Sequence, residues 1–134
     1  MKLAIASLAA CILAASAGSS LASTAGEAVT PYGTYTVTLS PKDPDVPSGV
    51  WRLVLRPGRH SLLSDRFPIQ NVGRLRVSGD VLIFSRETLC ARAVGRYRWR
   101  LSGRKLRLTL IGRDTCSGND RTVVLTSKPW TKRR

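Results

Sequence analysis

Residues 95–110, GRYRWRLSGRKLRLTL, decide the fold class. Apolar and polar residues alternate in two runs on either side of Ser102-Gly103, which is the pattern of two β-strands joined by a tight turn. With this turn, residues of like character face one another: Trp99 with Leu106, Tyr97 with Leu108, Arg100 with Lys105 and Arg98 with Arg107. The hairpin therefore has one apolar face and one cationic face. It predicts an antiparallel sheet with an apolar inside and a basic outside.

The first 22 residues predict a signal peptide for export. Lys2 precedes an apolar run of signal-peptide length, and Ser20-Leu21-Ala22 has small residues at the positions that a signal peptidase recognises. Cleavage after Ala22 predicts a secreted protein, extracellular or periplasmic. A minor alternative stays open, because Leu8-Ala9-Ala10-Cys11 resembles the lipobox of bacterial lipoproteins, in which the cysteine carries the lipid anchor.

The remaining chain has the length of one domain. We expect a flexible N-terminal segment at 23–31, a β-barrel domain at 32–130 and a basic tail at 131–134. After cleavage two cysteines remain, Cys90 and Cys116, and in an exported domain they predict a disulfide. Closing a loop of this size stabilises a fold by roughly 3 to 4 kcal/mol. Neither cysteine has a CxxC partner or a nearby histidine, which argues against a redox or metal pair.

Short runs of strand character, separated by turn residues, continue through the domain. Gly79-Asp80 predicts a second tight turn, with Val77 opposite Leu82 and Leu75 opposite Phe84. A single turn of helix fits near 64–71, and no other helix is expected. The eight predicted strands cover residues 32–40, 50–56, 60–63, 72–78, 81–85, 95–101, 104–110 and 120–127.

Antiparallel strands of this length and spacing favour an all-β barrel, because closing the sheet removes exposed strand edges. An eight-stranded barrel is just wide enough to be filled by its own side chains or to hold one small ligand. We expect it to be monomeric.

Gly49-Val50-Trp51 resembles the Gly-x-Trp signature of lipocalins. Further positions are similar to a group of small exported bacterial lipocalin-like proteins: Cys90, Gly95-x-Tyr97-x-Trp99, Leu106-x-Leu108, Asp114-x-Cys116, Arg121 and Pro129-Trp130. The resemblance implies a calycin-type barrel with a small apolar ligand in its mouth. The sequence departs from lipocalins because a strand at 32–40 precedes Gly-x-Trp, which lipocalins place on their first strand. The long hydrophobic core helix and the full set of lipocalin motifs are also absent.

Five aromatic side chains are expected inside the barrel: Tyr35, Trp51, Phe84, Tyr97 and Trp99. In one interpretation they fill the core, as large aromatics do in narrow barrels. In the other they line a pocket for a small hydrophobic ligand. The alternation of residues in the strands does not distinguish the two.

The chain carries 22 Lys and Arg residues against 8 Asp and Glu, a formal net charge of +14. Such a charge attracts anionic partners, here an envelope polymer or a membrane surface. The candidate residues for binding a polyanion are Arg96, Arg98, Arg100, Lys105 and Arg107. The alternative is a solvated surface, because the 17 arginines against 5 lysines also fit a bias of genome composition. Specific DNA recognition is not expected, since the chain has no recognition-helix signature.

An enzyme is the weakest class. His60 is the only histidine, and no serine, cysteine or carboxylate lies at a spacing that indicates a catalytic triad. The acidic residues are dispersed, so no catalytic residues, metal site or cofactor are predicted. The leading hypothesis is a secreted lipocalin-like barrel that binds a small apolar ligand. The alternative is a cationic interaction protein that binds anionic envelope polymers or lipid through its outer face.

Overall fold

A computed structural model of the 134-residue chain describes residues 26–42, 47–66, 70–116 and 120–134. The predicted signal peptide, its cleavage site and the lipobox cysteine Cys11 lie outside the described residues. In the part of the chain that is described, no helix is long and apolar enough to cross a membrane.

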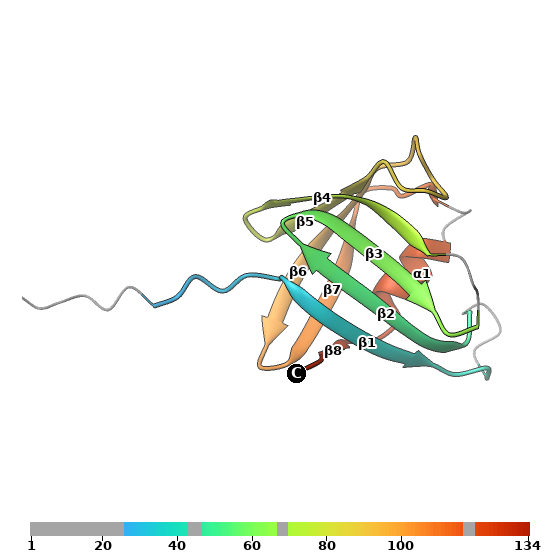
Figure 1. The fold of residues 1–134 in the computed structure, drawn as a ribbon, viewed down its shortest axis with the longest axis horizontal. Helices are drawn as coiled ribbons and strands as arrows, with labels where there is room; N and C mark the ends of the chain where they lie inside the picture. The colour runs from blue at the N-terminus through green and yellow to red at the C-terminus, as the bar shows by residue number, and fades with distance from the viewer. Residues whose placement is uncertain (1–25, 43–46, 67–69, 117–119) are drawn as a thin grey trace, which may run out of the picture.

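The chain folds into a closed antiparallel barrel of eight strands, which confirms the predicted fold class (Figure 1). Each strand pairs with the next along the chain, and β8 closes the barrel by pairing with both β7 and β1. The architecture is compatible with a calycin-like fold. The strands are β1 (Gly33–Leu39), β2 (Gly49–Arg56), β3 (Gly58–Ser64), β4 (Asn71–Ser78), β5 (Val81–Ser85), β6 (Gly95–Ser102), β7 (Lys105–Ile111) and β8 (Trp130–Lys132).

The β4–β5 hairpin has the predicted register. Val77 pairs with Leu82 and Leu75 with Phe84, on either side of a Gly79-Asp80 turn. Gly79 has a φ of +57°, a conformation that glycine adopts without a Cβ clash. The local turn chemistry was therefore sufficient to set the pairing here.

The predicted register of the β6–β7 hairpin is wrong by two positions. The turn is Gly103-Arg104, so that Ser102 pairs with Lys105, Arg100 with Arg107 and Trp99 with Leu108. Gly103 has a φ of +56° and takes the first turn position, as Gly79 does in β4–β5. Because side chains alternate with a period of two, the shift keeps every residue on its predicted face.

The predicted eighth strand at 120–127 is also wrong, because the helix α1 (Asp120–Thr126) occupies this range. Its buried residues, Arg121, Val124 and Leu125, recur at spacings of three and four, as on one face of a helix. The eighth strand is instead β8, which includes Thr131 and Lys132 of the predicted basic tail. The helical turn expected near 64–71 falls where β3 ends and β4 begins, and residues 67–69 lie outside the described part.

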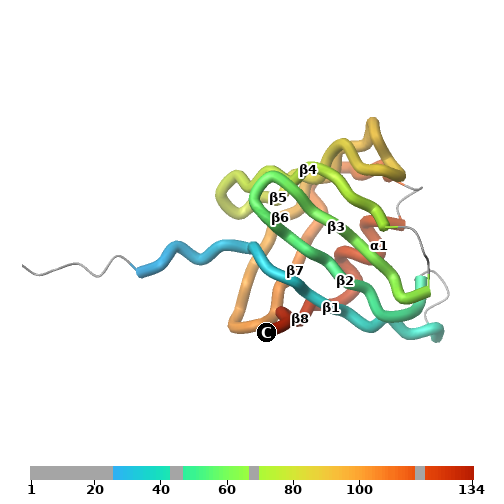
Figure 2. The backbone as a smooth tube through the Cα atoms, in the orientation of Figure 1, coloured from blue at the N-terminus to red at the C-terminus, as the bar shows by residue number. Residues whose placement is uncertain are grey.

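The core consists of the inward-facing side chains of the barrel together with the apolar face of α1. α1 contacts β7, and Trp130 at the start of β8 donates its indole N–H to the carbonyl of Leu125, 3.0 Å away. The described N-terminal residues 26–31 lead away from the barrel on the side opposite to α1 (Figure 2).

Candidate anion-binding surface and buried polar cluster

Three of the five aromatic residues predicted inside the barrel are completely enclosed. Tyr35 and Tyr97 expose 0% of their surface and Phe84 exposes 1%. The rings of Phe84 and Tyr97 meet edge to face, with centroids 5.6 Å apart. A side chain without accessible surface does not border a space large enough for water. These three rings therefore fill the core, and burial raises the pKa of Tyr35 to about 12.

The other two predicted interior aromatics, Trp51 and Trp99, are only partly buried and pack against the core from β2 and β6. The indole of Trp51 donates to the carbonyl of Pro47, 2.9 Å away, before β2 begins. The indole of Trp99 donates to the carbonyl of Gly79, 3.0 Å away, in the β4–β5 turn. Three of the five aromatic residues are thus enclosed in the core, and two lie at its edge with their indole N–H groups bonded to loop carbonyls.

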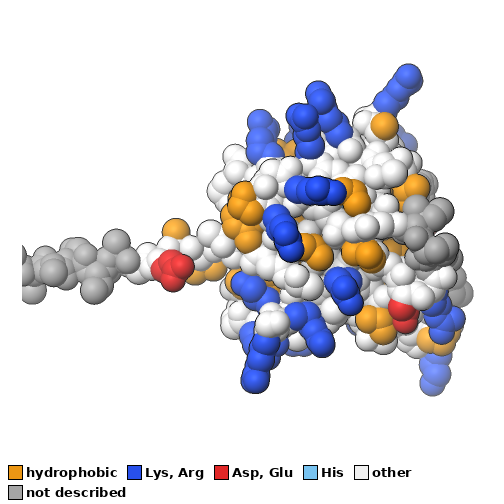
Figure 3. All heavy atoms as spheres, viewed as in Figure 1, with side chains coloured by type: hydrophobic (Ala, Val, Ile, Leu, Met, Phe, Trp, Pro, Cys, Tyr) orange, Lys and Arg blue, Asp and Glu red, His pale blue; other side chains and the backbone are white. Residues whose placement is uncertain are grey.

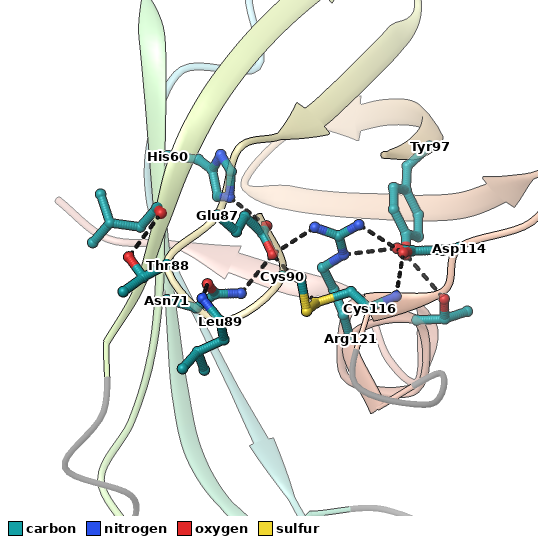
Figure 4. The surroundings of a disulfide bond; sticks show 12 residues. His60, Asn71, Glu87, Thr88, Leu89, Cys90, Tyr97, Asp114, Cys116 and Arg121 are labelled. Carbon is teal, nitrogen blue, oxygen red and sulfur yellow. Dashed lines mark hydrogen bonds and ion pairs between the residues drawn. A yellow bond between two sulfur atoms is a disulfide. The ribbon is translucent and has the colours of Figure 1, made fainter. Parts of the chain in front are cut away.

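The interior also contains a cluster of polar residues that the sequence did not lead us to expect (Figure 4). We call it the buried polar cluster. Its members come from separate elements: His60 from β3, Asn71 from β4, Glu87 from the loop after β5, Tyr97 from β6, Asp114 from the loop after β7 and Arg121 from α1.

Arg121 is the centre of the buried polar cluster. Its Nε and Nη2 donate to the two carboxylate oxygens of Asp114 at 2.7 and 2.6 Å, a bidentate pair. Its Nη1 lies 2.6 Å from Oε2 of Glu87 and pairs with that carboxylate. Burial alone lowers the pKa of Arg121, but the hydrogen bonds to Asp114 and Glu87 outweigh it and raise that pKa above its usual value. The guanidinium is therefore held in its charged form.

Both carboxylates of the cluster are ionised for the same reason. Burial alone raises the pKa of Glu87, but hydrogen bonds from His60 and Arg121 outweigh it and lower that pKa. Burial likewise raises the pKa of Asp114, and hydrogen bonds from Arg121, Tyr97 and the backbone of Cys116 outweigh it. Burial, and next its hydrogen bond to Asp114, raise the pKa of the Tyr97 hydroxyl, which keeps it a donor.

His60 bridges the cluster to the sheet. Its Nε2 lies 2.6 Å from Oε1 of Glu87, and its Nδ1 lies 3.1 Å from the carbonyl of Arg74. His60 thereby links the carboxylate of Glu87 to the backbone of β4.

Two glycines make room for the cluster. A Cβ at Gly95 would lie 2.7 Å from Nη2 of Arg121, and one at Gly73 would lie 2.7 Å from Cε1 of His60. Cβ atoms do not approach other heavy atoms this closely, so a side chain at either position would displace a member of the cluster. The Gly-x-Tyr spacing of Gly95 and Tyr97 was the signal in the sequence for this close approach.

The predicted disulfide joins Cys90 to Cys116 beside the cluster, with their Cα atoms 5.3 Å apart. It links the loop after β5 to the loop after β7 and is consistent with an oxidising, secreted environment. Potential ligand atoms of Glu87, Cys90 and Cys116 lie within 4.8 Å of one another. The sulfurs are bonded to each other and Glu87 is paired with Arg121, so this group is not arranged to bind a cation. The cluster holds the loops and α1 against the sheet.

The outer surface has the opposite charge balance. Of the 17 arginines only Arg121 is buried, and the other 16 are exposed. Lys and Arg side chains are spread over the face that β1 to β4 present in Figure 3. The five residues predicted to bind a polyanion, Arg96, Arg98, Arg100, Lys105 and Arg107, are all exposed on β6 and β7.

Some of these β6–β7 cations already have partners. Nε of Arg98 lies 3.0 Å from a carboxylate oxygen of Asp80, and Nζ of Lys105 donates to the hydroxyl of Thr131 at 2.8 Å. Arg100 is directly opposite Arg107. The predicted site is therefore a charged face on which part of the charge is already paired.

A second set of arginines, which we did not single out from the sequence, lies on β2, β3 and β4. Arg56 pairs with Arg59 across β2 and β3, and Arg59 pairs with Arg74 across β3 and β4. Three like charges thus stand in one row across three neighbouring strands. Like charges directly opposite each other destabilise a sheet, so this row has an energetic cost to the fold.

Two adjoining hollows open on the outer wall beside this row, and Arg52 lines both. One has a volume of about 440 Å³ and is lined by Thr34, Thr36, Thr38, Val50, Arg52, Arg133 and Arg134. The other has a volume of about 310 Å³ and is lined by Arg52, Val54, Arg56, Arg59, His60, Ser61, Leu63 and Gln70. Both combine cations with hydroxyl groups and apolar carbon.

Comparison with known proteins adds no assignment. No protein-family model, curated protein or solved structure matches this chain.

Proposed function

We propose that this protein is a secreted, lipocalin-like barrel whose outer wall binds an anionic polymer of the cell envelope. The observation that carries the proposal is the exposure of 16 of its 17 arginines. In the described ranges, the exposed acidic residues are Glu27, Asp65, Asp80 and Asp120. The remaining described carboxylates, those of Glu87 and Asp114, are used inside the barrel.

The many exposed cations favour a polymeric ligand over a single small anion. A surface with many uncompensated cations binds a polyanion by neutralising its charges and releasing its counterions, so each additional contact adds to the affinity. A row of like charges that disfavours the sheet, such as Arg56, Arg59 and Arg74, is relieved when an anion lies over it. A polymer with regularly spaced charges provides several such contacts at once.

The packing of the interior supports a polymer over a small apolar ligand. Tyr35, Phe84 and Tyr97 are enclosed by other core side chains and do not border a space that a ligand could enter. The hollows at Arg52 lie on the outer wall, where the lining is cationic and polar.

The proposal is tested by retention on heparin, a linear polyanion, compared with retention on a sulfopropyl column that offers the same charge without a polymer. We expect the protein to elute from heparin at clearly higher salt. Affinity for soluble heparin should fall steeply and linearly with the logarithm of salt concentration. Native mass spectrometry of the protein purified from its secretion serves as the second measurement.

Equal elution from the two columns would contradict the proposal, because it would show that net charge alone accounts for retention. A small molecule that copurifies with the barrel in native mass spectrometry would favour the apolar-ligand alternative instead.

A further inference from the structure

We infer that the polymer-binding site is the outer face of β1, β2 and β3, and that its ligand is an acidic polysaccharide. The inference rests on the proposed function and deepens it. The face, which we call the threonine–arginine tract, is made up of these residues from the lining of the two hollows that share Arg52: Thr34, Thr36, Thr38, Val50, Arg52, Val54, Arg56, Arg59, Ser61, Arg133 and Arg134.

The strand register brings the side chains of the tract onto one surface. Thr36 pairs with Arg52 across β1 and β2, and Val54 pairs with both Thr34 and Ser61. Because alternate residues of a strand point to the same side, Thr34, Thr36 and Thr38 form one outward row along β1. Hydroxyl groups, guanidinium groups and valine side chains therefore alternate across neighbouring strands.

The tract extends beyond β1, β2 and β3 because Arg133 and Arg134 are held beside β1. The backbone N–H of Arg133 donates to the carbonyl of Thr34, 2.7 Å away. This bond places Arg133 and Arg134 at the Thr34 end, where both line the larger hollow. Arg56 and Arg59, in the smaller hollow, provide cations beyond Arg52. Cations are thus spaced along two hollows that share Arg52.

The chemistry of the lining matches an acidic sugar polymer. A guanidinium binds a carboxylate or sulfate with two parallel hydrogen bonds. Threonine and serine hydroxyls both donate and accept, as sugar hydroxyls require. Val50 and Val54 offer apolar carbon to the C–H faces of sugar rings. Bare polyphosphate would accept hydrogen bonds from the arginines and the hydroxyls, but it has no donor for the hydroxyl oxygens and no C–H face for the valines.

The β6–β7 face provides a matched comparison within the same molecule. It carries four arginines and Lys105 against the five arginines of the tract, and Arg98 is paired with Asp80. The cations of the β6–β7 face do not line either of the two hollows that make up the tract. If charge alone selected the polymer, the two faces would bind equally well.

The test compares two triple variants of equal charge loss. The tract variant carries Arg52→Ser, Arg56→Ser and Arg59→Ser, and the hairpin variant carries Arg98→Ser, Arg100→Ser and Arg107→Ser. Binding of alginate, a linear uronate polysaccharide, is measured at several salt concentrations. We expect the tract variant to lose roughly tenfold or more in affinity and the hairpin variant about twofold. All six positions are exposed, so we expect both variants to fold. Urea unfolding of each variant is the check.

A third variant, Thr36→Val with Thr38→Val, removes hydroxyls without changing charge. It should weaken alginate binding severalfold and weaken binding of inorganic polyphosphate clearly less, because phosphate oxygens only accept hydrogen bonds whereas sugar hydroxyls also donate them. Equal losses in the two triple variants would overturn the location. Tighter binding of polyphosphate than of alginate at equal charge concentration, with no effect of the threonine changes, would overturn the polysaccharide ligand. Failure of the wild-type protein to bind heparin or alginate more tightly than its net charge requires would overturn the proposed function itself.

Discussion

Arginine is used in two different ways in this protein, and the comparison explains how one small barrel is both stable and strongly cationic. Inside, Arg121 is held by the carboxylates of Asp114 and Glu87, each within 2.7 Å. Outside, 16 arginines face water, and the ion pair that the described surface provides is Arg98 with Asp80. Carboxylates are scarce in this chain, and two of the 8 are placed where an unpaired cation would be most costly.

The difference follows from the dielectric environment. A buried cation without a partner is destabilising by several kcal/mol, whereas an exposed cation is solvated and screened by salt. The fold therefore depends on carboxylates inside and tolerates their scarcity outside. The uncompensated outer charge remains available to an anionic partner. Each of the following experiments perturbs one side of this comparison and leaves the other unchanged.

The largest effect is expected from Arg121→Met, which keeps the length of the side chain and removes its charge. Glu87 and Asp114 would be left buried without their guanidinium, and the free energy of unfolding should fall by about 3 to 5 kcal/mol. Urea denaturation measures the change.

The matched control for Arg121→Met is Arg100→Met on the outer wall, which should stay within about 0.5 kcal/mol of the wild type. Similar losses in the two variants would mean that the buried ion pairs do not distinguish Arg121 from the surface arginines.

The next largest effect is expected from replacing Cys90 and Cys116 together by serine. Without the bridge, the loops that carry Glu87 and Asp114 lose their covalent link, and the chain-entropy account predicts a loss of roughly 3 kcal/mol. Thermal unfolding of the variant, alongside the wild type with and without reductant, measures this contribution. Heparin retention at 20 °C should not change, because Arg52, Arg56 and Arg59 are on β2 and β3 and not in the loops that the bridge joins. A variant that loses both stability and retention would link the two regions.

Acid should weaken the buried polar cluster and leave the charge of the outer arginines unchanged. The pKa values of Glu87 and Asp114 are lowered in the folded protein, so their contribution to stability is fully present above their unfolded values of about 4. It is lost as the pH falls through the lower folded values. We therefore expect the free energy of unfolding to decline from about pH 4 downward.

Heparin retention provides the internal reference for the acid experiment, because guanidinium groups stay charged throughout this range. Retention at pH 4 should be no weaker than at pH 7. A stability that is independent of pH between 5 and 2 would contradict the ionised state of the buried carboxylates.

The sequence predicted the barrel because strand alternation and glycine turns are local features. The β4–β5 register followed from Gly79, and the β6–β7 error came from placing Gly103 second in its turn. α1 was missed because Val123 and Val124 are β-branched and favour strands in isolation. The burial of Arg121, Val124 and Leu125 against the barrel overrides that preference.

The buried polar cluster was not predictable from spacing, since Glu87, Asp114 and Arg121 come from three separate elements. Their pairing depends on how the loops and α1 close over the barrel. The outer row of Arg56, Arg59 and Arg74 was missed for a similar reason, because it exists only once three strands are in register. The partners within one hairpin were within reach of the sequence, and those across several elements were not.

The smallest effect should be a gain in stability. Arg59 lies directly opposite Arg56 and Arg74, so Arg59→Thr removes two like-charge contacts and places a β-branched residue on an outer strand face. The free energy of unfolding should rise by a few tenths of a kcal/mol, about the size of a cross-strand pair effect. The gain should shrink between 10 mM and 500 mM NaCl, where screening weakens the repulsion. Arg98→Thr is the control, since it breaks the pair with Asp80 and should give no gain. If Arg59→Thr both stabilises the fold and weakens polymer binding, the row of Arg56, Arg59 and Arg74 serves binding and lowers the stability of the fold. A loss of stability in Arg59→Thr would instead assign the arginine a structural role.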